Sequence, residues 1–196
     1  MKKAKEVHYI YIFRHGQTYY NRDGIFTGWK DIKLTPLGIK QARKIGKKLK
    51  NKQINLAFQT KLSRSKDTLK KVLKYHLECK KIITDNRVIE RNYGKLNGLS
   101  HETFIKTNGK EEYNKIHRNF YAKPLQGESF SDVEKRVKPF IKDLIKMIKK
   151  QKVNVAISAH GNSIRLFRKI MENLSIEKTK KLIIPYDDYY VYKIKV

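Results

Sequence analysis

Apolar and polar positions fall into blocks along this chain, and the blocks predict strands and helices that follow one another in turn. Residues 7–13 are β-branched and aromatic, which is typical of a strand buried on both faces. Residues 153–159 are similarly apolar and predict a second such strand. The further strand candidates are residues 54–58, 82–83, 88–89 and 189–196.

Between these strands, apolar residues recur at helical spacing. Thr35 and Pro36 predict a helix start, because threonine caps a helix and proline suits its first turn. Ser131 and Glu134 match a capping box for a long helix to about residue 150, and Pro139 inside it predicts a kink or a break. Other helices are expected over residues 63–76, in two short pieces over residues 100–120, after residue 162, and from residue 175.

Strands that alternate with helices favour a three-layer α/β/α sandwich around a largely parallel central sheet. The length of 196 residues suits a single domain, here residues 1–196, with a sizeable core. No apolar run is long enough to cross a bilayer, and residues 1–6 lack the apolar segment of a secretory signal. We therefore expect a cytoplasmic protein without a membrane partner.

The composition is strongly basic, with a formal net charge of +28 at pH 7. Such a charge invites a nucleic-acid interpretation, but the lysines are dispersed over predicted solvated helix faces and no nucleic-acid motif accompanies them. A positive surface would also speed association with a small phosphorylated substrate, which we expect as the main partner. The single cysteine, Cys79, excludes an intrachain disulfide. Whether the chain forms a homodimer stays open.

Two predicted strands, far apart in the sequence, each end on a histidine followed by a glycine. The first runs into Arg14 and His15, and the second into His160 and Gly161. Ligands of open α/β sheets bind beyond the carboxyl ends of the strands, so neighbouring strands would bring both imidazoles to one edge. Arginine offers a planar fork of donors to an oxyanion, and histidine serves as nucleophile or proton carrier near neutral pH.

Two further residues suit phosphoryl transfer at this edge. Arg64 stands at the start of the predicted helix 63–76, and helix N-termini favour anions, although alone it would be read as a surface residue. Glu90 follows an apolar segment, and a carboxylic acid there would protonate the alkoxide that phosphoryl transfer leaves behind. From spacing alone, this catalytic role and a salt bridge between Glu90 and Arg91 are equally well supported.

Five motifs, in order, resemble those of the histidine phosphatase superfamily, and within it the cofactor-dependent phosphoglycerate mutases. The resemblance spans nearly the whole chain, and Ile184 with Pro185 is similar to a late element of the family. The motifs are residues 13–18 (Phe-Arg-His-Gly-Gln-Thr, with Asn21), 26–31 (Phe-Thr-Gly-Trp-Lys-Asp), 62–65 (Leu-Ser-Arg-Ser), 90–99 (Glu-Arg-Asn-Tyr-Gly-Lys-Leu-Asn-Gly-Leu) and 159–165 (Ala-His-Gly-Asn-Ser-Ile-Arg).

The resemblance implies a mutase that interconverts 3-phosphoglycerate and 2-phosphoglycerate in glycolysis and gluconeogenesis. His15 would be the phosphorylated nucleophile and Glu90 the proton shuttle, while Arg14, Arg64 and His160 would surround the phosphoryl group. It also implies 2,3-bisphosphoglycerate as the priming phosphoryl donor, and no metal. The motif residues that would bind substrate are Gln17, Thr18, Asn21, Thr27, Gly28, Arg91, Tyr93, His101, His117, Arg118, Gly161 and Asn162.

The sequence also departs from the mutase pattern, which favours an alternative: a histidine-type phosphatase that hydrolyses small phosphomonoesters. His101 stands where mutases carry a lysine, and His117 with Arg118 stands where they carry paired arginines. The segment between residues 120 and 128 is also short. A less closed site would admit water to a phosphohistidine. The loops at residues 26–31 and 90–99, in contrast, favour the mutase.

Overall fold

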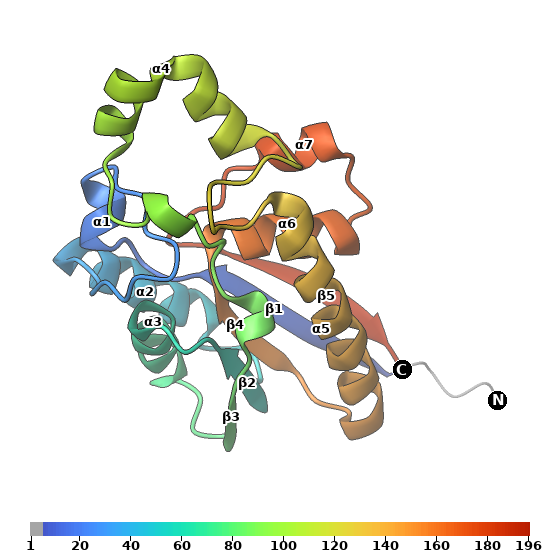
Figure 1. The fold of residues 1–196 in the computed structure, drawn as a ribbon. Helices are drawn as coiled ribbons and strands as arrows, with labels where there is room; N and C mark the ends of the chain where they lie inside the picture. Colours follow the sequence, from blue (N-terminus) through green and yellow to red (C-terminus); the bar gives the residue numbers. More distant parts are fainter. Residues whose placement is uncertain (1–5) are drawn as a thin grey trace.

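A five-stranded sheet forms the centre of the computed structural model, which describes residues 6–196 (Figure 1). The strands lie in the order β3-β2-β4-β1-β5, and all neighbours pair in parallel except β5, which is antiparallel to β1 at the edge. This confirms the predicted α/β fold with a largely parallel sheet. The strands are β1 (Val7–Arg14), β2 (Leu56–Gln59), β3 (Lys81–Thr84), β4 (Val155–Ala159) and β5 (Tyr189–Lys195).

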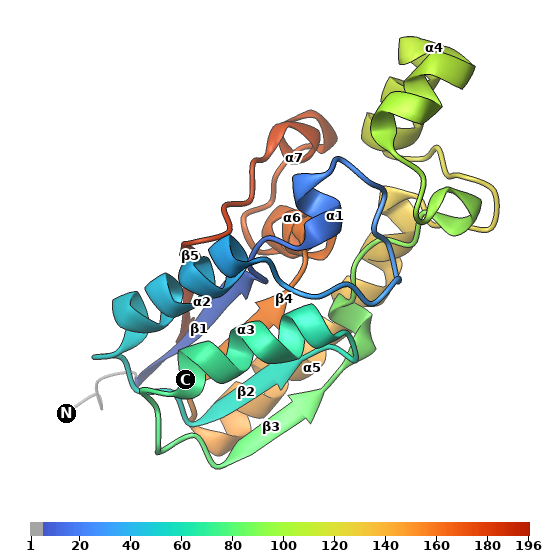
Figure 2. The same ribbon diagram turned by 90° about the vertical axis from the view of Figure 1, so that its left-hand side faces the viewer.

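Helices cover both faces of this sheet (Figure 2). Side chains alternate along β1, so Tyr11 and Phe13 pack in one apolar cluster with α2 and α3. Ile10 and Ile12 point the other way and pack in the cluster formed with α5 and α6. The four helices are α2 (Pro36–Leu49), α3 (Ser63–Leu73), α5 (Phe130–Gln151) and α6 (Gly161–Met171). None of the helices in residues 6–196 is both long and apolar enough to cross a membrane.

The carboxyl ends of β1 and β4 lie side by side. Arg14 is in register with Ala159, and the backbone N–H of His15 donates to the carbonyl oxygen of Ala159 at 3.0 Å. The pairing therefore carries His15 and His160 to the same edge of the sheet. The elements near this edge are α1 (Tyr19–Arg22), α4 (His101–Arg118), α7 (Ile176–Lys181) and the 3₁₀ turns η1 (Asn86–Val88) and η2 (Gly94–Leu96) (Figure 1).

The long helix begins elsewhere than predicted. Ser129, and not Ser131, is the N-cap of α5: its hydroxyl accepts from the Asp132 N–H, and the Asp132 carboxylate accepts from the Ser129 N–H, both at 3.0 Å. Of the kink or break predicted at Pro139, the break is wrong, since α5 is continuous through it. Proline removes one backbone donor, but buried side chains on both sides of it, including Phe140, hold the helix against the sheet.

Three other local predictions have mixed outcomes. Residues 82–83 lie in β3, but residues 88–89 form no strand, because Val88 ends the 3₁₀ turn η1 and is buried against the core. The two short helices are confirmed: Gly109, at φ 84°, separates two helical pieces within α4. The one-turn helix α1 was not expected, and Thr18 caps it through Asn21.

The segment that follows β1 packs closely, backbone against backbone, on the first turn of α2. The Thr35 N–H donates to the Gln17 carbonyl at 2.9 Å, and the Thr35 hydroxyl accepts from the Gly38 N–H at 3.0 Å. A Cβ on Gly38 would overlap the carbonyl oxygen of Gln17, and a Cβ on Gly16 would overlap that of Gly38. Glycine at both positions therefore lets the helix approach the strand end.

Gly38→Ala is expected to lower the free energy of unfolding by about 1–3 kcal/mol, because the methyl group forces the two backbones apart. Gly46→Ala is the matched control in the same helix. A Cβ added at Gly46 would lie 3.1 Å from Lys71 O and from the Tyr75 ring. Replacing glycine by alanine there also stabilises the helix by about 1 kcal/mol through its higher intrinsic helix propensity. Urea unfolding of both variants measures the difference, and equal losses would contradict the proposed contact.

Candidate active site

A cavity of about 190 Å³ opens at the carboxyl ends of β1 and β4. His160 lies beside it, fully buried, with its ring centroid 5.0 Å from that of His15. The structure therefore brings together most of the residues that the sequence indicated. Those that line the cavity are Arg14, His15, Asn21, Thr27, Gly28, Arg64, Glu90, Tyr93, His101, His117, Gly161 and Asn162.

His15 is held in one orientation and one tautomer. Its Nδ1 lies 2.7 Å from the carbonyl oxygen of Gly16, so Nδ1 carries the proton and donates it. Nε2 is then left with a free lone pair. Burial, together with the positive charges of Arg64 and Arg14, holds the pKa of His15 well below its usual range. The imidazole is therefore neutral at physiological pH, as a nucleophile must be.

The His160 ring is held by a buried contact with Thr60. Its Nε2 lies 2.9 Å from the hydroxyl of Thr60, and either atom can be the donor. Its Nδ1 is buried and has no partner in the described chain. Burial and the nearby charge of Arg64 hold the pKa of His160 well below its usual range.

Two arginines add further unused donors. Arg64 donates from Nη1 to Lys30 O and from Nη2 to Gly28 O, both at 2.7 Å, and burial lowers its pKa to about 10. Arg14 donates to Ile184 O at 3.2 Å. In both, the buried Nε–H lacks a partner among residues 6–196, as does Nδ1 of His160. Buried donors are normally satisfied, so the two Nε–H groups fit the oxygens of a bound oxyanion.

Glu90 reaches the same place from the loop after η1. Its Oε1 accepts from the backbone N–H of Arg91 at 2.7 Å and from that of Asn162 at 3.1 Å. A carboxylate oxygen of Glu90, a ring nitrogen of His15 and one of His160 all lie within 4.8 Å of one another. By donor type these three groups suit a metal ion, but the adjacent guanidinium groups of Arg14 and Arg64 oppose a cation there.

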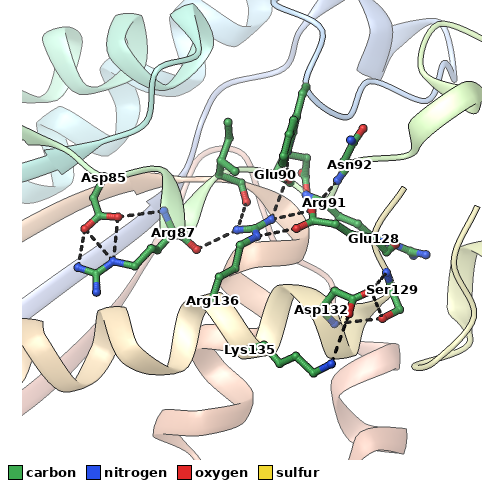
Figure 3. Close-up of polar contacts among 12 residues, drawn as sticks. Asp85, Arg87, Glu90, Arg91, Asn92, Glu128, Ser129, Asp132, Lys135 and Arg136 are labelled. Atoms are coloured by element: carbon green, nitrogen blue, oxygen red, sulfur yellow. Dashed lines mark hydrogen bonds and ion pairs between the residues drawn. The ribbon is translucent and has the colours of Figure 1, made fainter. Parts of the chain in front are cut away.

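Arg136 of α5 positions the loop that carries Glu90 (Figure 3). Its guanidinium donates to the backbone oxygens of Ile89, at 2.9 Å, and Glu90, at 3.1 Å. It also forms a salt bridge with Glu128, at 2.8 Å from Nε to Oε1. The other Glu128 oxygen accepts from the backbone N–H of Asn92 at 2.8 Å. This network fixes the loop backbone on both sides of Glu90.

Comparison with known families agrees with this geometry. Residues 10–195 match the model of the histidine phosphatase superfamily (branch 1). The chain belongs to this superfamily. Among curated relatives, the 2,3-bisphosphoglycerate-dependent phosphoglycerate mutase of Chelativorans sp. (strain BNC1) is 33% identical over 189 residues, covering 94% of this chain and 91% of that protein. The protein of that name from Rhizobium rhizogenes (strain K84) is 35% identical over 190 residues, with 94% and 89% covered.

Solved structures of other proteins share the fold. The structure named "Mycobacterial hydrolase 1" has a TM-score of 0.84 at 23% identity and covers 96% of this chain and 92% of its own. A mycobacterial glucosyl-3-phosphoglycerate phosphatase has a TM-score of 0.82, also at 23% identity, with 96% and 91% covered. At this identity, the likeness supports the histidine phosphatase fold and leaves the activity open.

Arg91 was expected to bind substrate, but the structure does not bring it to the cavity of this superfamily member. Its side chain is fully buried and donates to the carbonyl oxygens of Glu128, at 2.6 Å, Ile116, at 3.0 Å, and Ala122, at 3.1 Å. The guanidinium also packs over the rings of Tyr93 and Phe130. Arg91 therefore joins the Glu90 loop to two other segments, and it forms no salt bridge with Glu90.

Three other predicted binding residues also lie outside the cavity. The Gln17 side chain accepts from the Thr35 hydroxyl at 3.1 Å, and Thr18 caps α1, so both serve the local backbone. Arg118 donates to Lys180 O at 3.2 Å and lines a neighbouring groove. Sequence spacing could not separate these roles from substrate binding, because each residue is polar and close in sequence to one that lines the cavity.

Some lining residues were not predicted, namely Tyr20, Gly24, Ile25, Phe26, Arg165 and Tyr186. Arg165 follows Gly161 by four residues on α6, so helical spacing could have placed it on the cavity side. Tyr186 follows the late family element, and its ring lies 3.9 Å from the Arg14 guanidinium carbon. This contact between Tyr186 and Arg14 depends on how residues 182–186 pack beside β1, which the sequence alone does not reveal.

The α4 side of the cavity is aromatic and carries little charge. The His101 ring lies 4.2 Å from that of Phe26, and the His117 ring stacks on Tyr113 at 5.0 Å, centroid to centroid. Burial lowers the pKa of His101. Burial, with the nearby charge of Arg118, lowers the pKa of His117 to about 3. Both imidazoles are therefore neutral at pH 7, where a lysine or arginine would be cationic.

Arg91→Met is expected to cost about 3–5 kcal/mol of unfolding free energy, because buried carbonyl oxygens lose their donor. A residue that only bound substrate would instead raise KM and leave stability almost unchanged. Thermal or urea unfolding of the variant, beside Arg118→Met as an exposed control, distinguishes the two. Unchanged stability in Arg91→Met would contradict the structural role.

The stability of the protein should fall as the pH drops below 6.5. An unfolded His117 then takes up a proton, whereas the folded residue, with its pKa of about 3, does not. His117→Asn is expected to flatten this pH dependence by up to about 1.4 kcal/mol per pH unit between 6.5 and 3. Tyr113→Phe changes the same cluster without removing a histidine. If both variants kept the wild-type slope, the neutral state of His117 would be wrong.

Proposed function

We propose that this chain is a 2,3-bisphosphoglycerate-dependent phosphoglycerate mutase that interconverts 3-phosphoglycerate and 2-phosphoglycerate in glycolysis and gluconeogenesis. The observation that carries the proposal is the convergence of Arg14, Arg64 and His160 on His15, whose Nε2 keeps a free lone pair. Each of these three neighbours has a buried nitrogen without a partner among residues 6–196. The mutase relatives, at 33–35% identity over nearly the whole chain, support the substrate assignment. The site needs only a small phosphorylated partner.

In the first half of the reaction, Nε2 of His15 attacks phosphorus and the bond from phosphorus to the substrate oxygen breaks. Arg14, Arg64 and His160 stabilise the charge on the equatorial oxygens, which is the main requirement of phosphoryl transfer. The leaving oxygen takes a proton from Glu90, whose second carboxylate oxygen accepts no backbone hydrogen bond from residues 6–196. His15 is then phosphorylated and Glu90 is ionised.

In the second half, the free hydroxyl of a bound monophosphoglycerate attacks the phosphorus on His15, so the glycerate carries both phosphoryl groups until His15 accepts the one at the other position. Glu90 accepts the proton of that hydroxyl, and His15 leaves as a neutral imidazole. The buried donors suit the phosphoryl groups of 2,3-bisphosphoglycerate, which when bound would supply the phosphoryl group that primes His15. Asn162 lies at the N-terminus of α6 and lines the cavity, where it would position the substrate oxygens.

The neutral α4 wall favours a second candidate function, a phosphatase of small phosphomonoesters. Without a cation at His101 or His117, a glycerate carboxylate is held less firmly beside the phosphohistidine. Water would then compete with the glycerate hydroxyl as the acceptor, with Glu90 as its general base. The catalytic residues are the same, so only the acceptor distinguishes the two functions.

A coupled assay with 3-phosphoglycerate, run with and without 2,3-bisphosphoglycerate, tests the proposal. Formation of 2-phosphoglycerate that depends on the bisphosphate, with little inorganic phosphate released, is the expected result. Phosphate and product are followed in the same tube, and His15→Ala serves as the inactive control. Release of phosphate without isomerisation would instead assign the chain to the phosphatases.

Glu90→Gln is expected to lower kcat by at least about 100-fold, because the amide cannot exchange the proton at the substrate oxygen. The amide oxygen can still accept from Arg91 and Asn162, so the loop should keep its conformation. Glu134→Gln, which only loses a salt bridge to Lys169, is the matched control. A wild-type kcat in Glu90→Gln would exclude Glu90 as the proton shuttle.

A further inference from the structure

Arg14 is held by fewer hydrogen bonds than Arg64, although both face the same cavity. Arg64 donates to two backbone oxygens at 2.7 Å, one from each terminal nitrogen, so both ends of its guanidinium fork are fixed. Arg14 donates to one, Ile184 O, at the longer distance of 3.2 Å. Its Nε–H has no partner within residues 6–196, and it forms no salt bridge with an acid there. A further contact is therefore needed to orient the Arg14 guanidinium.

The ring of Tyr186 supplies that contact. Its centroid lies 3.9 Å from the guanidinium carbon of Arg14, where a cation is attracted to the negative face of an aromatic ring. Tyr186 also lines the active-site cavity, with its ring centroid 6.4 Å from that of His15. The stack of Tyr186 on Arg14 therefore lies beside the place that a phosphoryl group on His15 would occupy.

An aromatic ring suits this position better than a carboxylate. A salt bridge would also orient Arg14, but its negative charge would offset the positive charge that a bound oxyanion requires. A ring face attracts the cation and leaves the N–H donors, which lie in the guanidinium plane, free for other partners. Burial raises the pKa of the Tyr186 phenol, so the hydroxyl is neutral at physiological pH. Tyr186 therefore orients Arg14 without weakening its attraction for an anion.

Tyr186 is fixed in turn by the segment that carries it, residues 182–188, which we call the strap. At one end of the strap, Leu182 O accepts from Nε of Arg165 on α6 at 3.0 Å. At the other end, two acids pair with lysines of α2 at 2.6 and 2.9 Å: Asp187 with Lys44, and Asp188 with Lys48. α6 and α2 pack on opposite faces of the sheet. The strap therefore joins the two faces beside the end of β1, with Tyr186 between its anchors.

We propose that Tyr186 is a positioning residue for phosphoryl transfer, because its ring face holds the Arg14 guanidinium in place to donate to an oxygen of the phosphoryl group. This inference rests on the proposed function and adds a residue to its machinery. It applies to transfer to a glycerate and to water alike, since both pass through the same phosphohistidine. Arg14 stabilises charge in the five-coordinate transition state, so loss of the ring should affect that state more than the ground state.

Binding of orthovanadate and of inorganic phosphate, measured by calorimetry, tests the proposal without turnover. Orthovanadate can take up the five-coordinate geometry of the transition state, whereas phosphate resembles the ground state. Tyr186→Leu is expected to weaken the binding of vanadate about tenfold, and that of phosphate by less than about threefold. Tyr190→Leu is the matched control, because it removes a ring over Arg168 and a hydrogen bond to the strap outside the cavity. It should bind both anions as the wild type does.

A double-mutant cycle decides whether Tyr186 acts through Arg14. Arg14→Met alone should weaken vanadate binding about 100-fold. Adding Tyr186→Leu should weaken it no further, because no guanidinium is left to position. Losses that multiply in the double variant would mean that Tyr186 acts independently, and would overturn the proposal. Wild-type affinity for vanadate in Tyr186→Leu, or an equal loss in Tyr190→Leu, would overturn it as well.

Two substitutions that keep the ring cover the case in which Tyr186→Leu fails to fold. Tyr186→Phe keeps the ring face and should bind vanadate within about threefold of the wild type. Replacement of Tyr186 by trifluorophenylalanine keeps the shape but withdraws negative charge from the ring face, and should bind vanadate at least about threefold less tightly than Tyr186→Phe. Equal affinities of these two variants would contradict the role of the ring face.

Phosphorylation of His15 by 2,3-bisphosphoglycerate, followed in a single turnover, separates this inference from the proposed function. If vanadate binding couples Tyr186 to Arg14 but the wild type forms no phosphohistidine, the proposed function fails and the positioning of Arg14 stands. If Tyr186→Leu phosphorylates His15 as fast as the wild type, the positioning role fails and the proposed function stands.

Discussion

The parallel pairing of β1 with β4 is the constraint on which the site depends. The hydrogen bond from the His15 N–H to Ala159 O holds the two strand ends together, so both histidines leave the sheet at one edge. Nδ1 of His15 donates to Gly16 O, and Nε2 of His160 lies 2.9 Å from the Thr60 hydroxyl. These contacts fix both rings, and they leave the lone pair on Nε2 of His15 free for a nucleophilic role.

The buried cations keep this arrangement reactive. Arg64 and Arg91 donate to backbone carbonyls, and neither is neutralised by a carboxylate contact within the described chain. Carbonyl acceptors stabilise the guanidinium groups while leaving their positive field in place. The field of Arg64, together with that of Arg14, helps keep His15 neutral and attracts a phosphoryl dianion. The salt bridge between Arg136 and Glu128 lies one layer further out, where it fixes the Glu90 loop without lowering the charge of the cavity.

The sequence was most informative where local chemistry and spacing coincide. The apolar runs before His15 and His160 are strands because they are buried on both faces, and the polar turns after them mark the edge. Arg91 shows the limit of this reasoning: a motif places it beside Glu90, but only the packing of Ile116, Ala122 and Glu128 around its guanidinium reveals a structural role. The N-cap of α5 is Ser129 because its hydroxyl and the Asp132 carboxylate form a reciprocal capping box, two residues before the predicted cap.

The most direct measurement is the position of the phosphoryl group on the enzyme. The protein would be treated briefly with 2,3-bisphosphoglycerate, digested at alkaline pH, and analysed by mass spectrometry and phosphorus NMR. Because Nδ1 of His15 donates to Gly16, we expect phosphorylation at Nε2 of His15, and none at His160. Phosphorylation at Nδ1 of His15, at His160, or at no histidine would contradict the assignment of the nucleophile.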